Sequence, residues 1–133
     1  MKDISIYFQP INQDYSKLSE TIGEKIVCHD ENGFPDIEKK GIALIYCPEY
    51  RNSNLSEIEG AAENSIIEHL CELSAGEAWR FKLYNLGTII PGSTVDDTYY
   101  AVSQVTAELV KNEVIPIVIG GSQDLTYAMY QGY

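Results

Sequence analysis

The stretch "VIPIVIGGSQDLTYA" at residues 114–128 decides the fold prediction. It opens with a run of mostly β-branched apolar residues, which is typical of a strand covered on both faces. Two glycines, Gly120 and Gly121, end the run, and a helix is predicted from Asp124 onward. A buried strand that turns through glycines into a helix is a common unit of parallel α/β sheets.

The same rhythm occurs twice upstream. Apolar runs predict strands at 42–47 and 81–87, and a helical pattern follows each of them. Ser56 and Glu59 form a capping-box pattern before the first helix. Residues three and four apart are predicted to form its buried face: Ile58, Ala62, Ile66, Leu70 and Leu73.

The second helix is predicted to begin at Asp97 or Thr98 as its cap. One helical face is predicted from the residues at three- and four-residue spacing: Tyr99, Val102, Val105 with Thr106, Leu109 and Val110. The third helix is predicted to end with Gly132 as its C-cap.

Three strand–helix units predict an α/β fold, a partial three-layer α/β/α parallel sheet that is Rossmann-like. About three strands with flanking helices are expected within residues 41–133. Residues 1–40 have a weaker pattern and are interpreted as an N-terminal arm. In this arm, residues 3–11 read either as a short strand or as extended chain, and residues 14–26 contain a weak helical pattern.

Composition excludes several function classes. The 133 residues include 44% hydrophobic and 22% charged residues, which is typical of a soluble globular protein. The N-terminus lacks the apolar core of a signal peptide, so a cytoplasmic location is predicted. Nine basic residues face twenty acidic ones, a net charge of −11, so neither nucleic acid nor an anionic membrane is a predicted partner.

The cysteines predict no disulfide framework. Cys28, Cys47 and Cys71 are odd in number, and no CxxC pattern occurs. Reduced thiols are predicted, with Cys47 buried because it ends an apolar run.

Residues 120–122 form the candidate binding site. In open parallel sheets, ligands lie beyond the carboxyl ends of the strands, where helix N-termini favour anions. Gly120, Gly121 and Ser122 occupy that place. The stretch lacks the lysine of a phosphate-binding loop and the G-x-S-x-G pattern of a serine nucleophile. The alternative interpretation is that the glycines only make a tight turn.

The stretch "IPIVIGGSQDLTYA" (115–128) resembles the signature of the ureohydrolase family, which includes arginases, agmatinases and formimidoylglutamases. Members carry a buried strand, Gly-Gly, one residue, a histidine and then a helix. The strand at 42–47, the helix "EGAAENSIIEHL" (59–70) and "LYNLG" (83–87) follow in family order. The resemblance, closest to the formimidoylglutamase-like branch, implies that residues 41–133 are the N-terminal portion of an arginase-like α/β domain.

In that family the histidine binds one of two manganese ions, and aspartate-rich motifs on later strands bind the rest. The metal-activated water attacks an amidine, guanidinium or formimino carbon. The matching position here is Gln123, whose amide is a weaker ligand than imidazole.

Other residues are not predicted to complete such a site. His29 is predicted in a loop and His69 partly buried on a helix, and Asp96–Asp97 is predicted to be a helix cap. No catalytic residue is therefore assigned. This chain alone is predicted to bind no manganese and to be inactive.

The resemblance also implies a truncated fragment, the N-terminal segment of a longer protein with a small amidine or guanidino substrate. The 115–119 strand would then have an open edge, so self-association is expected. Two alternatives stay open: a non-catalytic ureohydrolase-fold binding or assembly module, and a small Rossmann-like nucleotide-binding domain.

Overall fold

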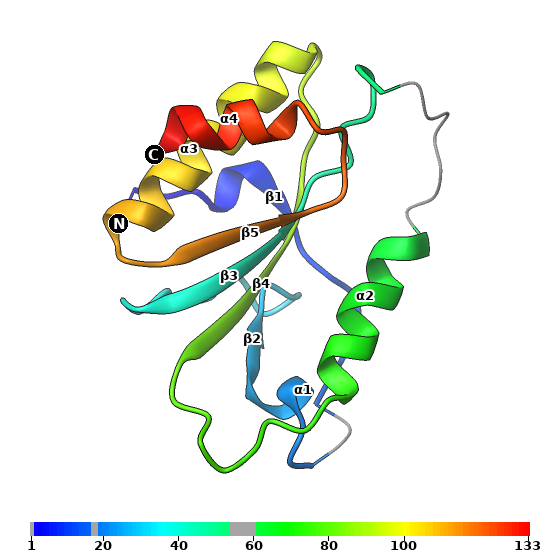
Figure 1. Cartoon of the computed structure of the whole chain (residues 1–133), viewed down its shortest axis with the longest axis vertical. Helices are drawn as coiled ribbons and strands as arrows, with labels where there is room; N and C mark the ends of the chain where they lie inside the picture. Colours follow the sequence, from blue (N-terminus) through cyan, green and yellow to red (C-terminus); the bar gives the residue numbers. More distant parts are fainter. Residues whose placement is uncertain (1, 17–18, 54–60) are drawn as a thin grey trace.

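A computed structural model describes residues 2–16, 19–53 and 61–133. Its centre is a five-stranded sheet with helices on both faces (Figure 1). The three long strands are β3 (Gly41–Tyr46), β4 (Lys82–Ile89) and β5 (Ile115–Ile119). They are parallel, with β3 between β4 and β5, so the predicted α/β fold and the three predicted strands are confirmed.

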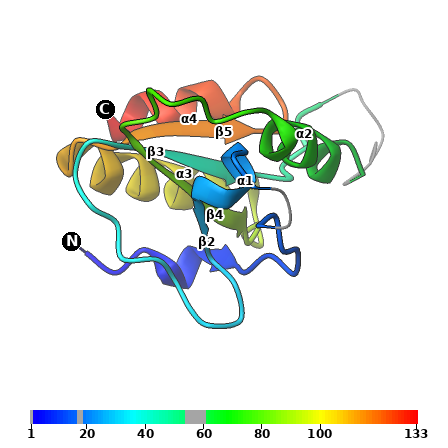
Figure 2. The same ribbon diagram turned by 90° about the horizontal axis from the view of Figure 1, so that it is seen from below.

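The first forty residues add two short strands to the sheet. β1 (Phe8–Gln9), preceded by the 3-10 turn η1 (Ser5–Tyr7), pairs antiparallel with the end of β4. After α1 (Ile22–Lys25), β2 (Ile26–Cys28) pairs parallel with an earlier part of β4. The arm and β5 therefore lie at opposite edges of the sheet (Figure 2).

Alternation along the strands builds a core on each face. Ala43 and Ile45 point to the face covered by α3 (Val95–Lys111) and α4 (Leu125–Gly132). Leu44 points to the opposite face, where it packs with residues of α1 and α2 (Ala61–Glu72). Successive strand residues project to opposite faces, so an unbroken apolar run fills both cores.

The predicted buried face of the helix at α2 is wrong at Ile66 and Leu73, whereas Leu70 packs against the core as predicted. Ile67 and Cys71 are buried, whereas Ile66 and Leu73 are 51% and 57% exposed. Ile66 and Ile67 are adjacent apolar residues, and two helical faces therefore fit the same spacing. His69 is likewise exposed and not partly buried, and its Nδ1 lies 3.5 Å from Glu72 Oε2. The predicted Ser56–Glu59 capping box and Ile58 lie outside the described residues.

The start of α3 lies earlier than predicted, whereas its predicted buried face is confirmed. Thr94 is the N-cap, and its hydroxyl accepts a hydrogen bond from the backbone N–H of Asp97. The Asp97 carboxylate accepts in return from Thr94 N at 2.8 Å, which completes a capping box. Asp97 is thus a capping residue of the first turn. Val102, Val105, Thr106 and Leu109 of the predicted face are buried, and Tyr99 and Val110 are partly buried.

Two other boundaries differ from prediction at glycines. β4 continues through Gly87, whose φ is +87°, and the register with β3 shifts there. A side chain at Gly87 would overlap the carbonyl of Gln9, so glycine lets β1 approach β4 closely. Gly132 is the last residue of α4 and not its cap, which is Tyr133.

His29 lies directly after β2 and is buried, at 8% exposed, and not in an open loop. Its Nδ1 donates to the carbonyl of Leu86 at 3.1 Å, and its ring meets Phe34 edge-on at 5.1 Å. Its backbone carbonyl accepts from Ile11 N at 2.9 Å. His29 therefore connects the segment around Ile11 to Leu86 of β4.

Among the described residues, no helix is long and apolar enough to cross a bilayer.

The two histidines make a matched pair for a stability test. His29→Ala removes a buried hydrogen bond and ring packing, so we expect about 2–3 kcal/mol of lost unfolding free energy. His69→Ala changes an exposed helix position, and we expect a change within about 0.5 kcal/mol. Urea denaturation followed by circular dichroism measures both, and equal effects would contradict this role of His29.

Candidate functional site

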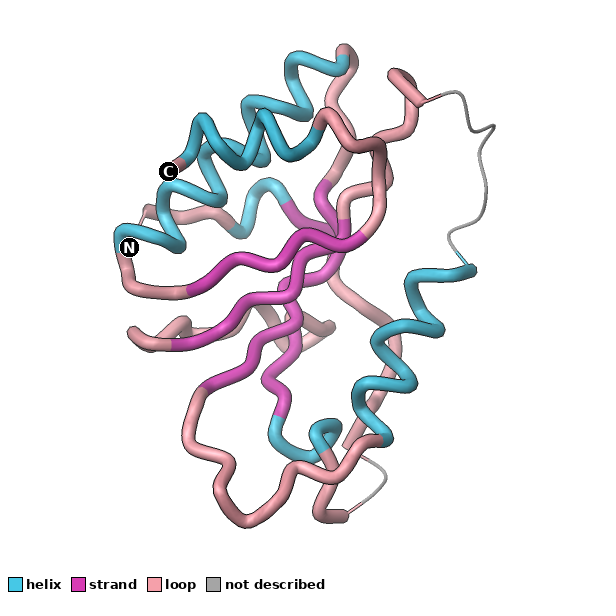
Figure 3. Tube along the Cα trace, in the orientation of Figure 1, coloured by secondary structure: helices cyan, strands magenta, loops and turns pink. Residues whose placement is uncertain are grey.

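The candidate site lies where the three long strands end. Because β3, β4 and β5 are parallel, the segments that follow them, 47–53, 90–94 and 120–124, come together at one edge of the sheet (Figure 3). This is the edge at which α/β sheets bind ligands. The candidate residues of the Gly-Gly turn therefore lie in the expected part of the fold.

Both glycines have a structural reason to be there. Gly120 and Gly121 have φ values of +85° and +77°, a conformation that L side chains rarely adopt. A Cβ on Gly120 would overlap the ring of Tyr46. One on Gly121 would overlap the Leu125 side chain and lie 2.8 Å from the carbonyl oxygen of Cys47. The turn thus packs directly against the end of β3, which supports the alternative that the glycines make a tight turn.

Ser122 and Gln123 make different contacts in this turn. Ser122 donates both its N–H (2.8 Å) and its hydroxyl (3.1 Å) to the backbone carbonyl of Glu49. Gln123 is exposed, and its backbone carbonyl accepts from Thr126 N at 3.1 Å. Ser122 therefore fastens the turn to the β3 segment, whereas the Gln123 side chain is at the surface of the edge.

Asp124 joins a second cluster with Tyr99 and Asn52. The Tyr99 hydroxyl donates to Asp124 Oδ2, and Asn52 Nδ2 donates to the same oxygen at 3.1 Å. Burial alone would raise the pKa of Asp124, but the neighbouring groups of Ser122, Tyr99 and Asn52 lower it overall. The hydrogen bond to Asp124 raises the pKa of Tyr99. At neutral pH the pair is therefore a carboxylate and a neutral phenol.

Glu49 and Arg51 form an ion pair at the same edge, in which the carboxylate is buried and the Arg51 side chain is 42% exposed. The Glu49 side chain is completely buried, and Arg51 donates to its two oxygens from Nε at 2.9 Å and Nη2 at 2.5 Å. Arg51 also donates to the carbonyls of Gly92 and Ser93, at 3.0 and 2.9 Å. The hydrogen bonds from Arg51 hold the pKa of Glu49 below its usual value. The ion pair thus links the β3 and β4 segments.

The sequence analysis did not identify four residues of this edge as site residues: Glu49, Arg51, Asn52 and Tyr99. The available signal was the polar run "EYRN" (49–52) directly after a buried strand, at the end where parallel sheets form sites. A charged pair there indicates an ordered segment. The groups that this segment contacts follow other strands, and the local pattern does not show them.

The described residues do not fit a two-manganese site. Among them, no three His, Cys, Asp or Glu side chains are grouped closely enough to hold a metal ion. Two carboxylates of the edge, the buried Glu49 and the partly buried Asp124, already bind Arg51 and Tyr99. His29 follows β2 and bonds to Leu86 of β4, and His69 lies on α2, so neither belongs to this cluster.

A test of the ion pair uses Arg51→Met with Arg80→Met as control. Removing Arg51 leaves Glu49 buried without its cation, so we expect the variant to unfold at clearly lower urea concentration at pH 7. Arg80 is exposed and donates to backbone carbonyls of its own loop, so its loss is expected to matter little.

The pH dependence follows from the lowered pKa of Glu49. Its stabilising contribution is present above the unfolded-state pKa, about 4.3, and is lost as pH falls through the lower folded value. The difference between Arg51→Met and the unaltered chain should therefore shrink as the pH is lowered through this range. A difference between the two that stays constant from pH 7 to pH 3 would contradict this assignment.

Comparison with known proteins identifies the fold. No protein-family model and no curated protein sequence matches the chain. Among solved structures, formimidoylglutamase from Bacillus subtilis matches with a TM-score of 0.63 and 20% sequence identity. The match covers 93% of this chain and 41% of that protein, so the chain spans less than half of its neighbour's length. The chain thus has an arginase-like, ureohydrolase-like α/β fold.

Proposed function

We propose that the chain is the N-terminal part of a ureohydrolase-like hydrolase that acts on linear amidine or guanidino C–N bonds. The observation that carries the proposal is the structural match to formimidoylglutamase over 93% of the chain. Fold alone does not specify a reaction. The position of the Gly-Gly turn at the carboxyl edge of the sheet adds a second line of support.

In this proposal the chain supplies one wall of the site and no catalytic group. Gly120 and Gly121 let the turn pack closely on β3, and Ser122 fastens it there. Gln123 then occupies the place of the family histidine, with an exposed side chain. Metal chemistry would need ligands beyond the described residues, and we derive no step through a metal here. We also propose a cytoplasmic location, which three unpaired thiols favour.

A second candidate is a non-catalytic binding or assembly module of the same fold. The specific support is that two carboxylates of the edge are engaged by their own chain, the buried Glu49 by Arg51 and the partly buried Asp124 by Tyr99. Such a module would be stabilised by a small amidine or guanidino compound without hydrolysing it.

The assay that tests the proposal uses the native gene product at its natural length. We expect manganese-dependent release of formamide, urea or ammonia from a formimino, guanidino or amidino compound, and no release by the isolated 133-residue chain. Gln123→His in the native product should tighten manganese binding about tenfold, because imidazole is the better ligand. Gln123→Asn is the matched amide control. Absence of hydrolysis with all three compound classes would overturn the enzymatic proposal.

We also propose self-association through β5, an edge strand of the described sheet. Ile115 and Ile117 are 59% and 42% exposed on it. Cys47 N donates to Ile119 O at 3.1 Å, so alternate groups, those of Pro116 and Val118, face the open edge. Proline there loses no ladder hydrogen bond, but it also weakens pairing with another strand.

Light scattering at increasing protein concentration tests this association. We expect a reversible dimer that Ile117→Lys abolishes. Tyr130→Lys, a control on the exposed face of α4 where the side chain is 77% exposed, should leave the dimer unchanged. A monomer at every concentration would contradict the proposal.

A further inference from the structure

The turn that follows β2 contains a dipeptide that takes no part in the site at the strand ends. Asn32 is the one asparagine in the chain that a glycine follows. Asn32 and Gly33 are both exposed, and they lie between the buried His29, directly after β2, and the partly buried Phe34. The sequence Asn-Gly has a specific chemistry, because an asparagine side chain reacts with the backbone nitrogen of the residue after it.

The reaction needs only water as a second reactant. The backbone nitrogen of Gly33 loses its proton to the medium and attacks Cγ of Asn32, so a Cγ–N bond forms. The Cγ–Nδ2 bond breaks, and ammonia leaves after taking up a proton. Water then opens the resulting succinimide ring at one of its two carbonyls, which gives aspartate or isoaspartate. The residue gains one negative charge, which changes the local electrostatics.

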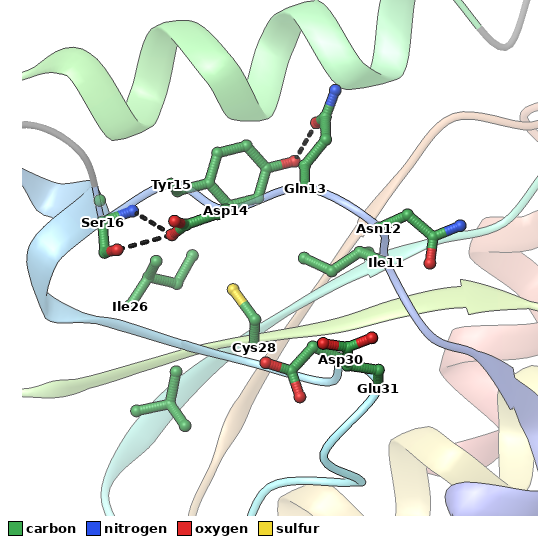
Figure 4. Close-up of a pocket in the computed structure, with 12 residues that line it drawn as sticks. Ile11, Asn12, Gln13, Asp14, Tyr15, Ser16, Ile26, Cys28, Asp30 and Glu31 are labelled. Atoms are coloured by element: carbon green, nitrogen blue, oxygen red, sulfur yellow. Dashed lines mark hydrogen bonds between the residues drawn. The ribbon is translucent and has the colours of Figure 1, made fainter.

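The surroundings of Gly33 favour this attack. Glycine carries no side chain that would shield the nitrogen, and the φ of Gly33 is +124°, a value that other residues rarely adopt. A Cβ built on Gly33 would meet no atom within 4 Å. Figure 4 shows the preceding residues Asp30 and Glu31 on the wall of a cavity of about 810 Å³. The turn is therefore accessible to the water that opens the ring.

Hydrogen bonds to Asp30 oppose the attack in the folded turn. Gly33 N donates to the carbonyl oxygen of Asp30 at 3.0 Å. Asn32 donates to the Asp30 carboxylate from its backbone N at 2.8 Å and from Nδ2 at 3.2 Å. The first bond retains the proton that Gly33 must lose, and the Nδ2 bond restrains the side chain. The reaction therefore requires the turn to open, so its rate measures local opening.

Three other asparagines are less suited to this reaction. Asn85 is 5% exposed within β4. Asn112 donates its Nδ2 to a backbone carbonyl one helical turn earlier, at 2.7 Å. Asn52 is exposed, but its Nδ2 donates two hydrogen bonds, each 3.1 Å long. Leucine, glutamate and serine follow these three residues respectively, and their side chains shield the backbone nitrogen.

We propose that Asn32 is a site of spontaneous deamidation and that its conversion to aspartate or isoaspartate loosens the turn after β2. The product has no Nδ2 to donate to Asp30, and it places a second carboxylate beside that of Asp30. Like charges so close together repel each other. Isoaspartate also lengthens the backbone by one carbon atom, which displaces the N–H groups that donate to Asp30. This modification does not depend on the proposed function.

Peptide mass spectrometry tests the proposal after the whole chain is incubated in oxygen-18 water at mildly alkaline pH. Opening of the ring adds one labelled oxygen, so each modified peptide is recognised by its mass. We expect the Asn32 peptide to be labelled about tenfold faster than the Asn52 and Asn112 peptides, because glycine leaves the nitrogen unshielded. In urea the Asn32 peptide should be labelled faster still, since the bonds to Asp30 are then lost.

Two amide variants assign the label to this position. Asn32→Gln keeps an amide but must close a larger ring, which forms far more slowly, so we expect it to abolish labelling of this peptide. Asn12→Gln, a control at another exposed asparagine, should leave the rate at Asn32 unchanged. An Asn32 peptide that stays unlabelled in the folded chain while it is labelled in urea would overturn the proposal. Earlier labelling at Asn52 or Asn112 would overturn it as well.

Asn32→Asp reproduces the aspartate product and tests whether the turn is loosened. At pH 7 and low salt we expect this variant to unfold at lower urea concentration than the unaltered chain. Salt at about 0.5 M should reduce the difference, because it screens exposed charges. Gln131→Glu adds the same charge at an exposed position of α4 and should lower the unfolding midpoint less. Equal midpoints for Asn32→Asp and the unaltered chain would overturn the loosening of the turn.

Discussion

Glu49 is the residue on which the carboxyl edge of the sheet depends. Its backbone carbonyl accepts two hydrogen bonds from Ser122, and its buried carboxylate binds the fork of Arg51. Arg51 in turn reaches the carbonyls of Gly92 and Ser93. Segments after three different strands are thus joined through one residue. A buried carboxylate is costly without its cation, so the three segments are ordered together or not at all.

This arrangement limits what the edge can do chemically. A general base or a metal ligand needs a carboxylate with oxygens available to the reacting group or the ion. At this edge Arg51 engages both oxygens of Glu49. Tyr99 and Asn52 engage only Oδ2 of Asp124, and its Oδ1 has no hydrogen-bond partner among the described residues. Hydrogen bonds already stabilise both charges, as their lowered pKa values reflect. The bonds of Glu49 and Asp124 therefore hold the strand-end segments together.

The sequence was sufficient for elements that their local pattern determines. The long strands and the buried face of α3 follow from apolar periodicity, because Val102, Val105 and Leu109 fit one helical face alone. The face of α2 was not predictable, since Ile66 and Ile67 both fit a buried stripe and tertiary packing selects the second. At the site, the glycines were placed correctly at the strand end. Arg51 follows Glu49 by only two residues. The contacts of Arg51 with Ser93, of Ser122 with Glu49 and of Tyr99 with Asp124 join residues distant in sequence, and no local pattern encodes them.

The acidity of the chain has different consequences in different places. A net charge of −11 argues against polyanionic partners everywhere on the molecule, but it does not locate a site. The contacts of each carboxylate decide the role of its charge. At the strand ends the carboxylates are paired with groups of their own chain, so their charge serves folding. At Asp14 and Asp30 the carboxylates instead accept hydrogen bonds from the backbone N–H groups of Ser16 and Asn32, two residues further on, so these charges stabilise local turns.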